Sequence, residues 1–373
     1  MLINGQALIQ LLEQLAPKRY AVENDRIGLQ LGTLNKPIST ALVALDVTDE
    51  VVEEAIAAKA ELIIAHHAII FRPLAKIDTS TPVGKLYEKL IKNDIAVYIS
   101  HTNLDVAEGG INDWLADQIG IEKSGRTFLE QVYQDDWLKL VVYVPESHVD
   151  AVRAALWQAG AGEIGNYSSC SFAVRGEGTF LPGEATNPYV GTSGKLEKAE
   201  EIRLETVIPA SKHRKIVSAM IKAHPYEEAA YDVFPTLLEG RSYGLGRAGK
   251  LEQPAVLGEL AERLKAAFDV PVLRVVGALD TPIRKAAVLG GSGAKYVGKA
   301  KFAGADVLVT GDIDYHTAHD ALAAGMTIID AGHNIEKVMK QQVADWLADK
   351  LLAEKMDTKI VASKLHTEPF QFV

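Results

Sequence analysis

The chain has 373 residues, of which 48% are hydrophobic and 24% are charged, so it is long enough to bury a sizeable core in more than one domain. The formal net charge of −10 argues against an extended phosphate-binding surface, and with no helix-turn-helix or zinc-finger spacing DNA binding is the function least supported. The single cysteine, Cys170, excludes an internal disulfide and a cysteine-based zinc site, and fits a reducing compartment.

The N-terminal residues carry apolar side chains at helical spacing, which predicts a first amphipathic helix and not a signal peptide. No segment approaches the roughly 18 apolar residues that a membrane span needs, so we expect a cytoplasmic protein without a membrane partner. Short runs rich in Val, Ile and Leu predict buried strands at Ala41–Val47, Glu61–Ala65, Ile95–Ile99, Ala286–Leu289, Val307–Val309 and Thr327–Ile329. Helical patterns lie between them, at Asp49–Ala60, Pro82–Asn93 and Ile111–Ile119. Alternating strands and helices predict an α/β core with largely parallel sheets that helices cover on both faces.

The middle of the chain has a different pattern, and we interpret residues 126–246 as a domain inserted into a core of residues 1–125 and 247–373. Its predicted elements follow the order strand, helix, strand, strand, helix, strand, at Lys139–Val144, 147–158, 168–174, 202–207, 211–223 and Tyr231–Val233. This order is the ferredoxin-like α+β plan. The stretch Gly176–Lys198 is rich in Gly, Thr, Ser and Pro and predicts a loop or turns.

Polar and ionisable residues gather where the predicted core strands end. His66 and His67 follow the second strand, Asp105 lies shortly after the third, and His333 and Glu336 follow the last. Because ligand sites in open α/β sheets form at the carboxyl ends of the strands, we expect these residues to meet in one crevice. Three imidazoles and two carboxylates suit zinc first, with iron and manganese as alternatives. Two such ions about 3.5–4 Å apart can lower the pKa of a bridging water, which favours hydrolysis.

Each of these motifs also has a purely structural interpretation. A His-His pair can cap a helix and bond within the core, and Asp105 can cap the helix that begins near Ile111. His333 and Glu336, three apart, share a face if the segment is helical, but can equally be a surface pair.

Three further groups are predicted around the metal ligands. His101 and His316 are the candidate catalytic residues, as general bases or substrate contacts, and Asp312 is a candidate acceptor for the second N–H of a metal-bound imidazole. For His316, the start of a capped helix is an equally good interpretation. The run Gly290-Gly-Ser-Gly293 fits an anion cradle or a tight turn.

These motifs together resemble the Nif-three-like family, also called GTP cyclohydrolase 1 type 2 homologues. The matching stretches are Ile27-Gly-Leu-Gln-Leu-Gly32, Ala65-His-His-Ala68, Ser100-His-Thr-Asn-Leu-Asp105, Gly109-Gly-Ile-Asn-Asp113, Gly290-Gly-Ser-Gly293, Thr310-Gly-Asp-Ile-Asp-Tyr-His316 and Gly332-His-Asn-Ile-Glu336. The resemblance covers both ends of the chain and implies two divalent ions held by His66, His67, Asp105, His333 and Glu336. Many relatives have Trp-Asp-Asn before the first stretch, whereas this chain has Asn24-Asp25-Arg26, which puts in doubt a substrate contact there.

The inserted segment resembles that of the longer bacterial members, where it is similar to PII and CutA proteins. The stretch His224-Pro-Tyr-Glu-Glu-Ala-Ala-Tyr-Asp232 carries this part of the resemblance, which implies a hexameric ring. The leading hypothesis is a metal-dependent hydrolase of a nucleotide or related small anionic molecule. The alternatives are a non-enzymatic metal-binding regulatory hexamer with a PII-like sensor domain, and an oligomer in which the metals only stabilise the fold.

Overall fold

A computed structural model describes residues 1–372 and divides the chain into two units, which are described one at a time. Unit 1 comprises residues 1–133 and 243–373, and unit 2 comprises residues 134–242. The strands that connect them, β7 (Glu130–Asp135) and β12 (Arg241–Leu245), form a two-stranded sheet. Within residues 1–372, no helix combines the length and the apolar character required to cross a bilayer.

The first sheet of unit 1 has five strands, of which four are parallel and one edge strand is antiparallel. Its order is β18 (Lys359–Ala362), β4 (Thr40–Ala44), β5 (Leu62–Ala65), β6 (Ala96–Ile99) and β2 (Gly28–Leu31). Every residue of β5 and β6 is buried, as expected for strands covered on both faces. A short pair, β1 (Ile3–Asn4) with β3 (Pro37–Ile38), lies outside this sheet.

The second sheet of unit 1 has three parallel central strands and an antiparallel strand at each edge. Its order is β13 (Arg247–Val256), β15 (Pro282–Ser292), β16 (Val307–Gly311), β17 (Thr327–Asp330) and β14 (Arg274–Val276).

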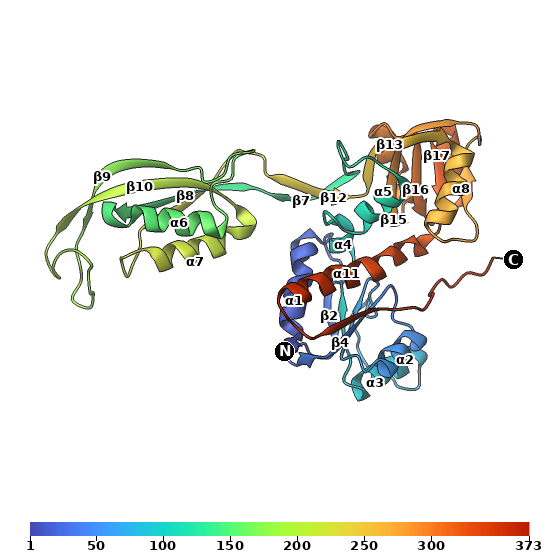
Figure 1. Cartoon of the computed structure of the whole chain (residues 1–373), viewed down its shortest axis with the longest axis horizontal. Coiled ribbons are helices and arrows are strands. Elements are labelled where there is room, and N and C mark those ends of the chain that lie inside the picture. The colour runs from blue at the N-terminus through green and yellow to red at the C-terminus, as the bar shows by residue number, and fades with distance from the viewer. Residues whose placement is uncertain (373) are drawn as a thin grey trace. The chain divides into compact units, whose positions relative to one another are not determined.

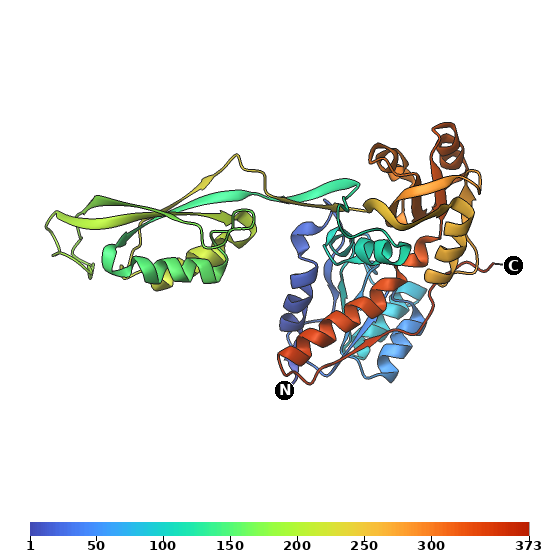
Figure 2. The same cartoon turned by 45° about the horizontal axis from the view of Figure 1, so that its top comes forward.

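Helices cover both faces of each sheet, and alternate residues of one strand therefore enter different cores. Val43 packs with α1 (Gly5–Leu15) and α11 (Val338–Ala353) in the largest core, whereas Leu42 packs with α2 (Asp49–Ala57) and α3 (Pro82–Lys92) in a second core. In the second sheet, Val288 joins the largest core and Leu308 joins a core with α9 (Val297–Phe302) and α10 (Tyr315–Ala323). Figures 1 and 2 show α5 and α11 in the layer between the two sheets of unit 1.

The helices of unit 1 begin at residues that the sequence marks as starts. Thr48 caps α2 by accepting from Val51 N, and Thr81 caps α3, whose first residue is Pro82. The α-helices are α1 (Gly5–Leu15), α2 (Asp49–Ala57), α3 (Pro82–Lys92), α4 (Thr102–Val106), α5 (Ile111–Ile119), α8 (Leu257–Ala267), α9 (Val297–Phe302), α10 (Tyr315–Ala323) and α11 (Val338–Ala353). Short 3-10 helices are η1 (Lys18–Tyr20), η4 (Ala294–Tyr296) and η5 (His333–Lys337).

Unit 2 is a four-stranded antiparallel sheet with two helices packed on one another. Its elements are β8 (Trp137–Pro145), η2 (Glu146–His148), α6 (Val149–Ala159), β9 (Phe172–Phe180), β10 (Glu197–Pro209), η3 (Ala210–Lys212), α7 (His213–Ala223) and β11 (Tyr231–Pro235). The sheet order β11-β8-β10-β9 and the chain order of strands and helices are those of the ferredoxin-like plan. Figure 1 shows both helices against one face of this sheet.

The mixed α/β class is confirmed, and each of the six predicted core strands overlaps an observed strand, although β4 ends three residues before the predicted Val47. One prediction in unit 2 is wrong in part. The stretch Gly176–Lys198 is not all loop, because β9 continues to Phe180 and β10 already begins at Glu197. The long β9–β10 ladder offsets the weak strand propensity of Gly176 and Gly178, which pair across to Glu201 and Ala199. The strand predicted at 168–174 begins only at Phe172.

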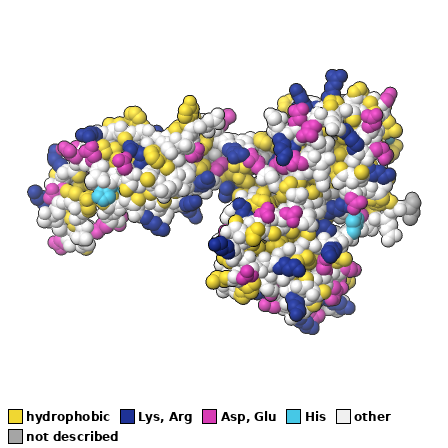
Figure 3. Space-filling view, in the orientation of Figure 1, with side chains coloured by type: hydrophobic (Ala, Val, Ile, Leu, Met, Phe, Trp, Pro, Cys, Tyr) yellow, Lys and Arg dark blue, Asp and Glu magenta, His cyan; other side chains and the backbone are white. Residues whose placement is uncertain are grey.

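The face seen in Figure 3 carries acidic and basic side chains interleaved with apolar ones, in both units. This distribution differs from the continuous basic surface that nucleic-acid binding requires.

Candidate metal centre

His66 and His67 stand directly after β5, where the chain leaves the sheet. Their backbone N–H groups both donate to Leu45 O, at 3.2 and 3.0 Å, so the segment stays tied to the end of β4 after β5 has stopped. The regular alternation of side chains ends here, and both imidazoles face the same side. Their ring centroids are 5.0 Å apart.

Asp105 lies on the short helix α4, which follows β6. Its side chain is buried and its backbone carbonyl accepts from Asn112 Nδ2 at 3.0 Å. Asn112 Oδ1 in turn accepts from Gly290 N, so one side chain links α4, α5 and β15. The helix α5 is capped by Gly110, and the carboxylate of Asp105 is therefore free of the capping role considered above.

His333 and Glu336 lie on η5, immediately after β17. In a 3-10 helix, side chains three residues apart are eclipsed, and His333 Nε2 lies 3.3 Å from Glu336 Oε2. Glu336 is 3% exposed, so the pair is not the surface pair that the isolated motif also allowed.

The five predicted ligands converge. His66 Nε2 lies 3.9 Å from Asp105 Oδ1 and 3.7 Å from Glu336 Oε2, and His67 Nε2 lies 3.2 Å from Glu336 Oε2. Three overlapping groups have ligand atoms within 4.8 Å of one another: His66 with Asp105 and Glu336, His67 with His333 and Glu336, and His66 with His67 and His101. Glu336 belongs to two of these groups, and its Oε2 lies within 3.7 Å of the Nε2 atoms of His66, His67 and His333.

Every imidazole of the cluster is held through Nδ1 by an acceptor outside it. The acceptors are Ser100 O for His66 (2.9 Å), Asp46 for His67 (2.6 Å), Asp25 for His101 (2.9 Å) and Asp312 for His333 (2.6 Å). Since a carbonyl or carboxylate only accepts, each Nδ1 carries a hydrogen, and each Nε2 is directed at the centre, where it can bind a metal ion once it carries no proton. This is the second hydrogen bond by which metal-binding histidines are usually oriented.

The ionisation of the cluster follows from the mixture of carboxylates and imidazoles. Burial opposes protonation of His67, but its hydrogen bonds with Asp46 and Glu336 prevail and raise its pKa to about 10. The hydrogen bond with Glu336 raises the pKa of His333 to about 9. Burial, only partly offset by His66, raises the pKa of Asp105. Burial also disfavours ionisation of Glu336, yet the surrounding imidazoles hold its pKa well below the usual range.

Two buried atoms at the centre are placed as a pair of ligands for one cation. Among the residues that the structure describes, neither His66 Nε2 nor Asp105 Oδ1 has a hydrogen-bond partner. Their separation of 3.9 Å is too long for a hydrogen bond and suits two ligands of one ion. A polar group left unpaired in a protein interior costs about 1–3 kcal/mol, and two in contact with the same space imply a ligand.

The glycine run Gly290–Gly293 provides room for these ligands. Gly291 has a φ of 66°, and a Cβ on it would lie 2.7 Å from Glu336 Oε1 and 3.3 Å from His333 Nε2. Only glycine tolerates both the backbone conformation and the close approach. The residues present therefore fit a bound metal ion.

The two candidate catalytic histidines have different surroundings. His101 is half-buried and its ring centroid is 4.8 Å from that of His66, so it belongs to the cluster. His316 is exposed in the first turn of α10, where Asp314 caps the helix by accepting from His316 N, and it is in none of the three groups. Its catalytic role stays a prediction, and the capped helix start is what the structure displays.

Two acidic residues of the site were not predicted from the sequence. Asp46 follows β4 as the ligands follow the other strands, so its position at a strand end was the available signal. Asp25 precedes β2 in a loop, and the available signal was that it keeps the Asp of the relatives' Trp-Asp-Asn, although both neighbours differ. Its carboxylate also accepts from Thr102 N at 3.0 Å and from the Thr102 hydroxyl, which ties the loop to α4.

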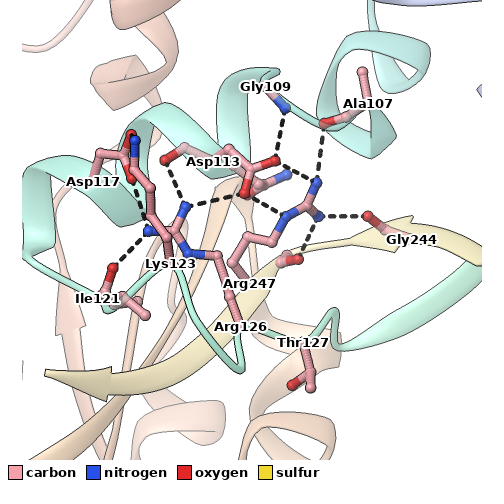
Figure 4. Close-up of polar contacts among 12 residues, drawn as sticks. Ala107, Gly109, Asp113, Asp117, Ile121, Lys123, Arg126, Thr127, Gly244 and Arg247 are labelled. Atoms are coloured by element: carbon pink, nitrogen blue, oxygen red, sulfur yellow. Dashed lines mark hydrogen bonds and ion pairs between the residues drawn. The ribbon is translucent and has the colours of Figure 1, made fainter. Parts of the chain in front are cut away.

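A buried ion-pair network fixes the end of α4 and the start of α5 (Figure 4). Arg247 donates through Nε and Nη2 to the two oxygens of Asp113, each at 2.9 Å, and through Nη2 to Ala107 O at 3.0 Å. Arg126 donates to the same carboxylate at 3.1 Å. Because Ala107 directly follows α4, this network holds the helix that carries Asp105.

Comparison with known proteins identifies the family of the chain. A family described as Duf34/NIF3 (NGG1p interacting factor 3) matches residues 3–369. The chain is 54% identical to a Halalkalibacterium halodurans protein and 49% identical to a Bacillus subtilis protein, each named "GTP cyclohydrolase 1 type 2 homolog", over at least 99% of either chain. A solved structure of a Bacillus cereus protein related to NIF3 is 52% identical and superimposes over 100% of both chains with a TM-score of 0.93. The chain therefore belongs to the Duf34/NIF3 family.

Proposed function

We propose that this protein holds two divalent metal ions, zinc first among them, and hydrolyses a nucleotide or a related small anionic molecule. The observation that carries the proposal is the pair of donor sets that share Glu336. One set is His66, Asp105 and Glu336, and the other is His67, His333 and Glu336. Two ions joined by a common carboxylate are a recurrent arrangement in phosphatases and nucleases.

When bound, the ions would supply Lewis-acid activation of a water molecule and of a substrate oxygen. The residues of the chain would orient the ligand atoms and transfer protons. The four acceptors that bond to the Nδ1 atoms keep every Nε2 directed at the centre. Because the ligands are imidazoles and carboxylates and include no thiolate, the site favours ions that also bind oxygen atoms of a substrate. His101, oriented by Asp25, would take up or return a proton at Nε2 on the substrate side.

The substrate class rests on charge and on the relatives. A centre that holds two dications attracts phosphate oxygens. The relatives carry a name that refers to a GTP cyclohydrolase. For GTP, water attack at the purine C8 would open the imidazole ring, and for a phosphoester it would displace the alcohol.

The test is metal analysis of the purified protein, followed by turnover of GTP and a panel of nucleotides and phosphoesters with zinc, iron or manganese restored. We expect about two ions per chain and measurable hydrolysis. His67→Ala should abolish turnover and lower metal content. The control is His319→Ala, an exposed histidine on α10 outside the cluster.

Two outcomes would contradict the proposal in different ways. Metal-loaded protein that hydrolyses no member of the panel leaves the regulatory alternative, in which His67→Ala removes metal-linked binding of a ligand or partner. A single ion with no open coordination position, together with a large fall in melting temperature on chelation, indicates a structural metal.

We also propose that the chain assembles into a cytoplasmic hexamer in which unit 2 is a PII/CutA-like module. The ferredoxin-like order of its strands supports the module. Light scattering coupled to gel filtration tests the hexamer, and a monomer or dimer would contradict it.

A further inference from the structure

Unit 2 contains a cavity of about 570 Å³ that the metal centre does not use. Aromatic rings form much of its wall, and carboxylates stand among them. The side chains that matter below are Tyr143, Phe180, Tyr189, Tyr226, Glu201 and Glu228. A cavity of this size with an apolar wall and a few polar groups has the dimensions of a small-molecule site.

His224 holds one of these rings in place. Its Nε2–H donates to Tyr143 O at 2.8 Å, and its Nδ1 accepts from Tyr226 N at 3.1 Å. Both ring nitrogens are thus used in the neutral form, and burial lowers the pKa of His224. The residue is 7% exposed, so it does not itself offer a polar group to a ligand. The histidine is a fixed support for Tyr226.

Tyr226 is the centre of an aromatic group. Its ring centroid lies 5.9 Å from that of Tyr189 and 6.4 Å from that of Phe180. Its hydroxyl oxygen is buried beside the carboxylate of Glu201, and burial together with that carboxylate raises the pKa of Tyr226 to about 12. The phenol and the carboxylate thus stand side by side in the wall of the cavity.

The loop between β9 and β10 closes over the cavity from the other side. It carries Tyr189, and its Asn187 N donates to the carboxylate of Glu227, with the shorter contact at 3.3 Å. Glu227 follows Tyr226 directly in the chain. The closing loop and the segment that carries Tyr226 are therefore joined at the edge of the cavity.

The charges of the wall are unbalanced toward the negative. Arg175 pairs with Glu146, and Arg203 Nε lies 3.0 Å from Glu205. Glu177 pairs with Lys198 at 2.8 Å. Within residues 1–372, no cation pairs with Glu201 or Glu228, and both line the cavity.

We propose that this cavity binds a small organic ammonium cation with an aromatic or apolar body. The aromatic faces attract a cation and receive the apolar body, and the two unpaired carboxylates neutralise the charge. The Tyr226 hydroxyl accepts an N–H or contacts the methyl groups of the ammonium. An anion is disfavoured, since both arginines of the wall already have carboxylate partners.

The test uses the full chain, loaded with zinc, and three probes of similar shape in calorimetric titrations. The probes are benzyltrimethylammonium, the neutral benzyl alcohol and the anionic phenyl phosphate. We expect the cation to bind with a Kd of about 1 mM or tighter and at least about tenfold more tightly than either of the others.

Substitutions in the wall of the cavity test whether the cation binds there. The double variant Glu201→Gln with Glu228→Gln should weaken the cation about tenfold and leave benzyl alcohol unchanged. Tyr189→Leu should weaken the cation about threefold to tenfold, whereas Tyr189→Phe keeps the ring and the affinity. The matched control is Glu200→Gln, because alternation along β10 directs Glu200 away from the face of Glu201.

Three results would overturn the proposal. They are no heat of binding from the cation at about 10 mM, equal binding of phenyl phosphate or benzyl alcohol, and an unchanged cation affinity in the double variant. Circular dichroism of each variant shows whether it is folded, and the ratio of cation to neutral affinity within one protein does not depend on the folded fraction. His67→Ala should bind the cation as the unaltered chain does, which separates this site from the metal centre.

Discussion

Among the residues around the cluster, Asp25 is the one whose role depends most on the tertiary structure. Its carboxylate orients His101, and its contacts with Thr102 fix the start of α4. Burial disfavours its ionisation, but the hydrogen bonds from His101 and Thr102 hold the pKa of Asp25 far below the usual range. It is therefore an anion at all working pH values and a permanent acceptor for His101 Nδ1.

Asp25→Asn should lower kcat about 10-fold to 100-fold while metal content stays at the level of the unaltered chain. An amide can offer its own N–H to His101 Nδ1, and the ring then loses its fixed tautomer. Turnover and metal content are measured on the same sample. The control is Glu23→Gln, an exposed neighbour, and equal kcat in both variants would remove Asp25 from the catalytic site.

Metal binding should release protons and weaken as the pH falls. With pKa values of about 10 and 9, His67 and His333 are protonated at pH 7 in the metal-free protein, and an ion must displace those protons. The apparent affinity should rise toward pH 9, by up to about tenfold per pH unit for each proton displaced. Titration calorimetry in buffers of different ionisation heat counts the protons.

The same raised pKa values bear on the stability of the metal-free protein with the opposite sign. A raised folded-state pKa stabilises the fold below the unfolded value of about 6.5, and this stability is lost as the pH rises through about 9–10.

Asp312→Asn should reduce the number of protons released on metal binding, because it removes one of the two carboxylates beside His333. A proton count of zero in the unaltered chain would contradict the assignment.

The helices α4 and α5 are held in place by the guanidinium groups of two arginines, Arg126 and Arg247, that lie outside both helices. Both arginines are nearly buried, and both donate to Asp113 on α5. Burial disfavours the Asp113 carboxylate, yet Arg247 and Arg126 hold its pKa below the usual range. The sequence alone predicted α5 with its observed ends, but contained no sign of which charges would pair across it.

Asp113→Asn should destabilise unit 1 by about 3 kcal/mol, because it leaves the buried guanidinium group of Arg247 without a counter-charge and Arg126 with only the more exposed Asp117. A lowered folded-state pKa stabilises the fold above the unfolded value of about 3.9, and this stability is lost as the pH falls through the folded-state value. The difference between the variant and the unaltered chain should therefore shrink in acid. Urea unfolding at several pH values measures it.

The matched control is Asp117→Asn, which removes the more exposed partner of Arg126 and should cost about 0.5 kcal/mol. Equal effects of the two substitutions would show that burial does not set the strength of this network.

At the scale of the whole molecule, the metal ligands and unit 2 are separable. All five predicted ligands, with His101 and the acceptors behind Nδ1, lie in unit 1. Unit 2 has a core of its own, formed by β8, β10, α6 and α7. The rings of Tyr133 and Tyr243, at the points where unit 1 is interrupted, have centroids 6.1 Å apart.

Replacement of residues 134–242 by a short Gly-Ser linker should leave the metal content unchanged at about two ions per chain, because a linker of a few residues spans the interruption without strain. Metal analysis and a melting curve with and without chelator measure the outcome. The same replacement should remove the binding of benzyltrimethylammonium. Loss of metal with a folded protein would mean that unit 2 contributes to the centre.

Local patterns in the sequence were enough to predict the class of elements, the strands of the core and the five residues that meet in the cluster. Apolar runs indicate strands that are buried on both faces of a sheet. Polar residues at the carboxyl ends of such strands indicate a ligand site in an open α/β sheet. The tertiary structure alone decided which groups stand behind each imidazole, that Glu336 serves two donor sets, and that Tyr226 enters a cavity with Glu201 and Glu228. Such contacts join residues far apart in the chain, and only the packing of the two sheets of unit 1, and of the strands of unit 2, brings them within reach.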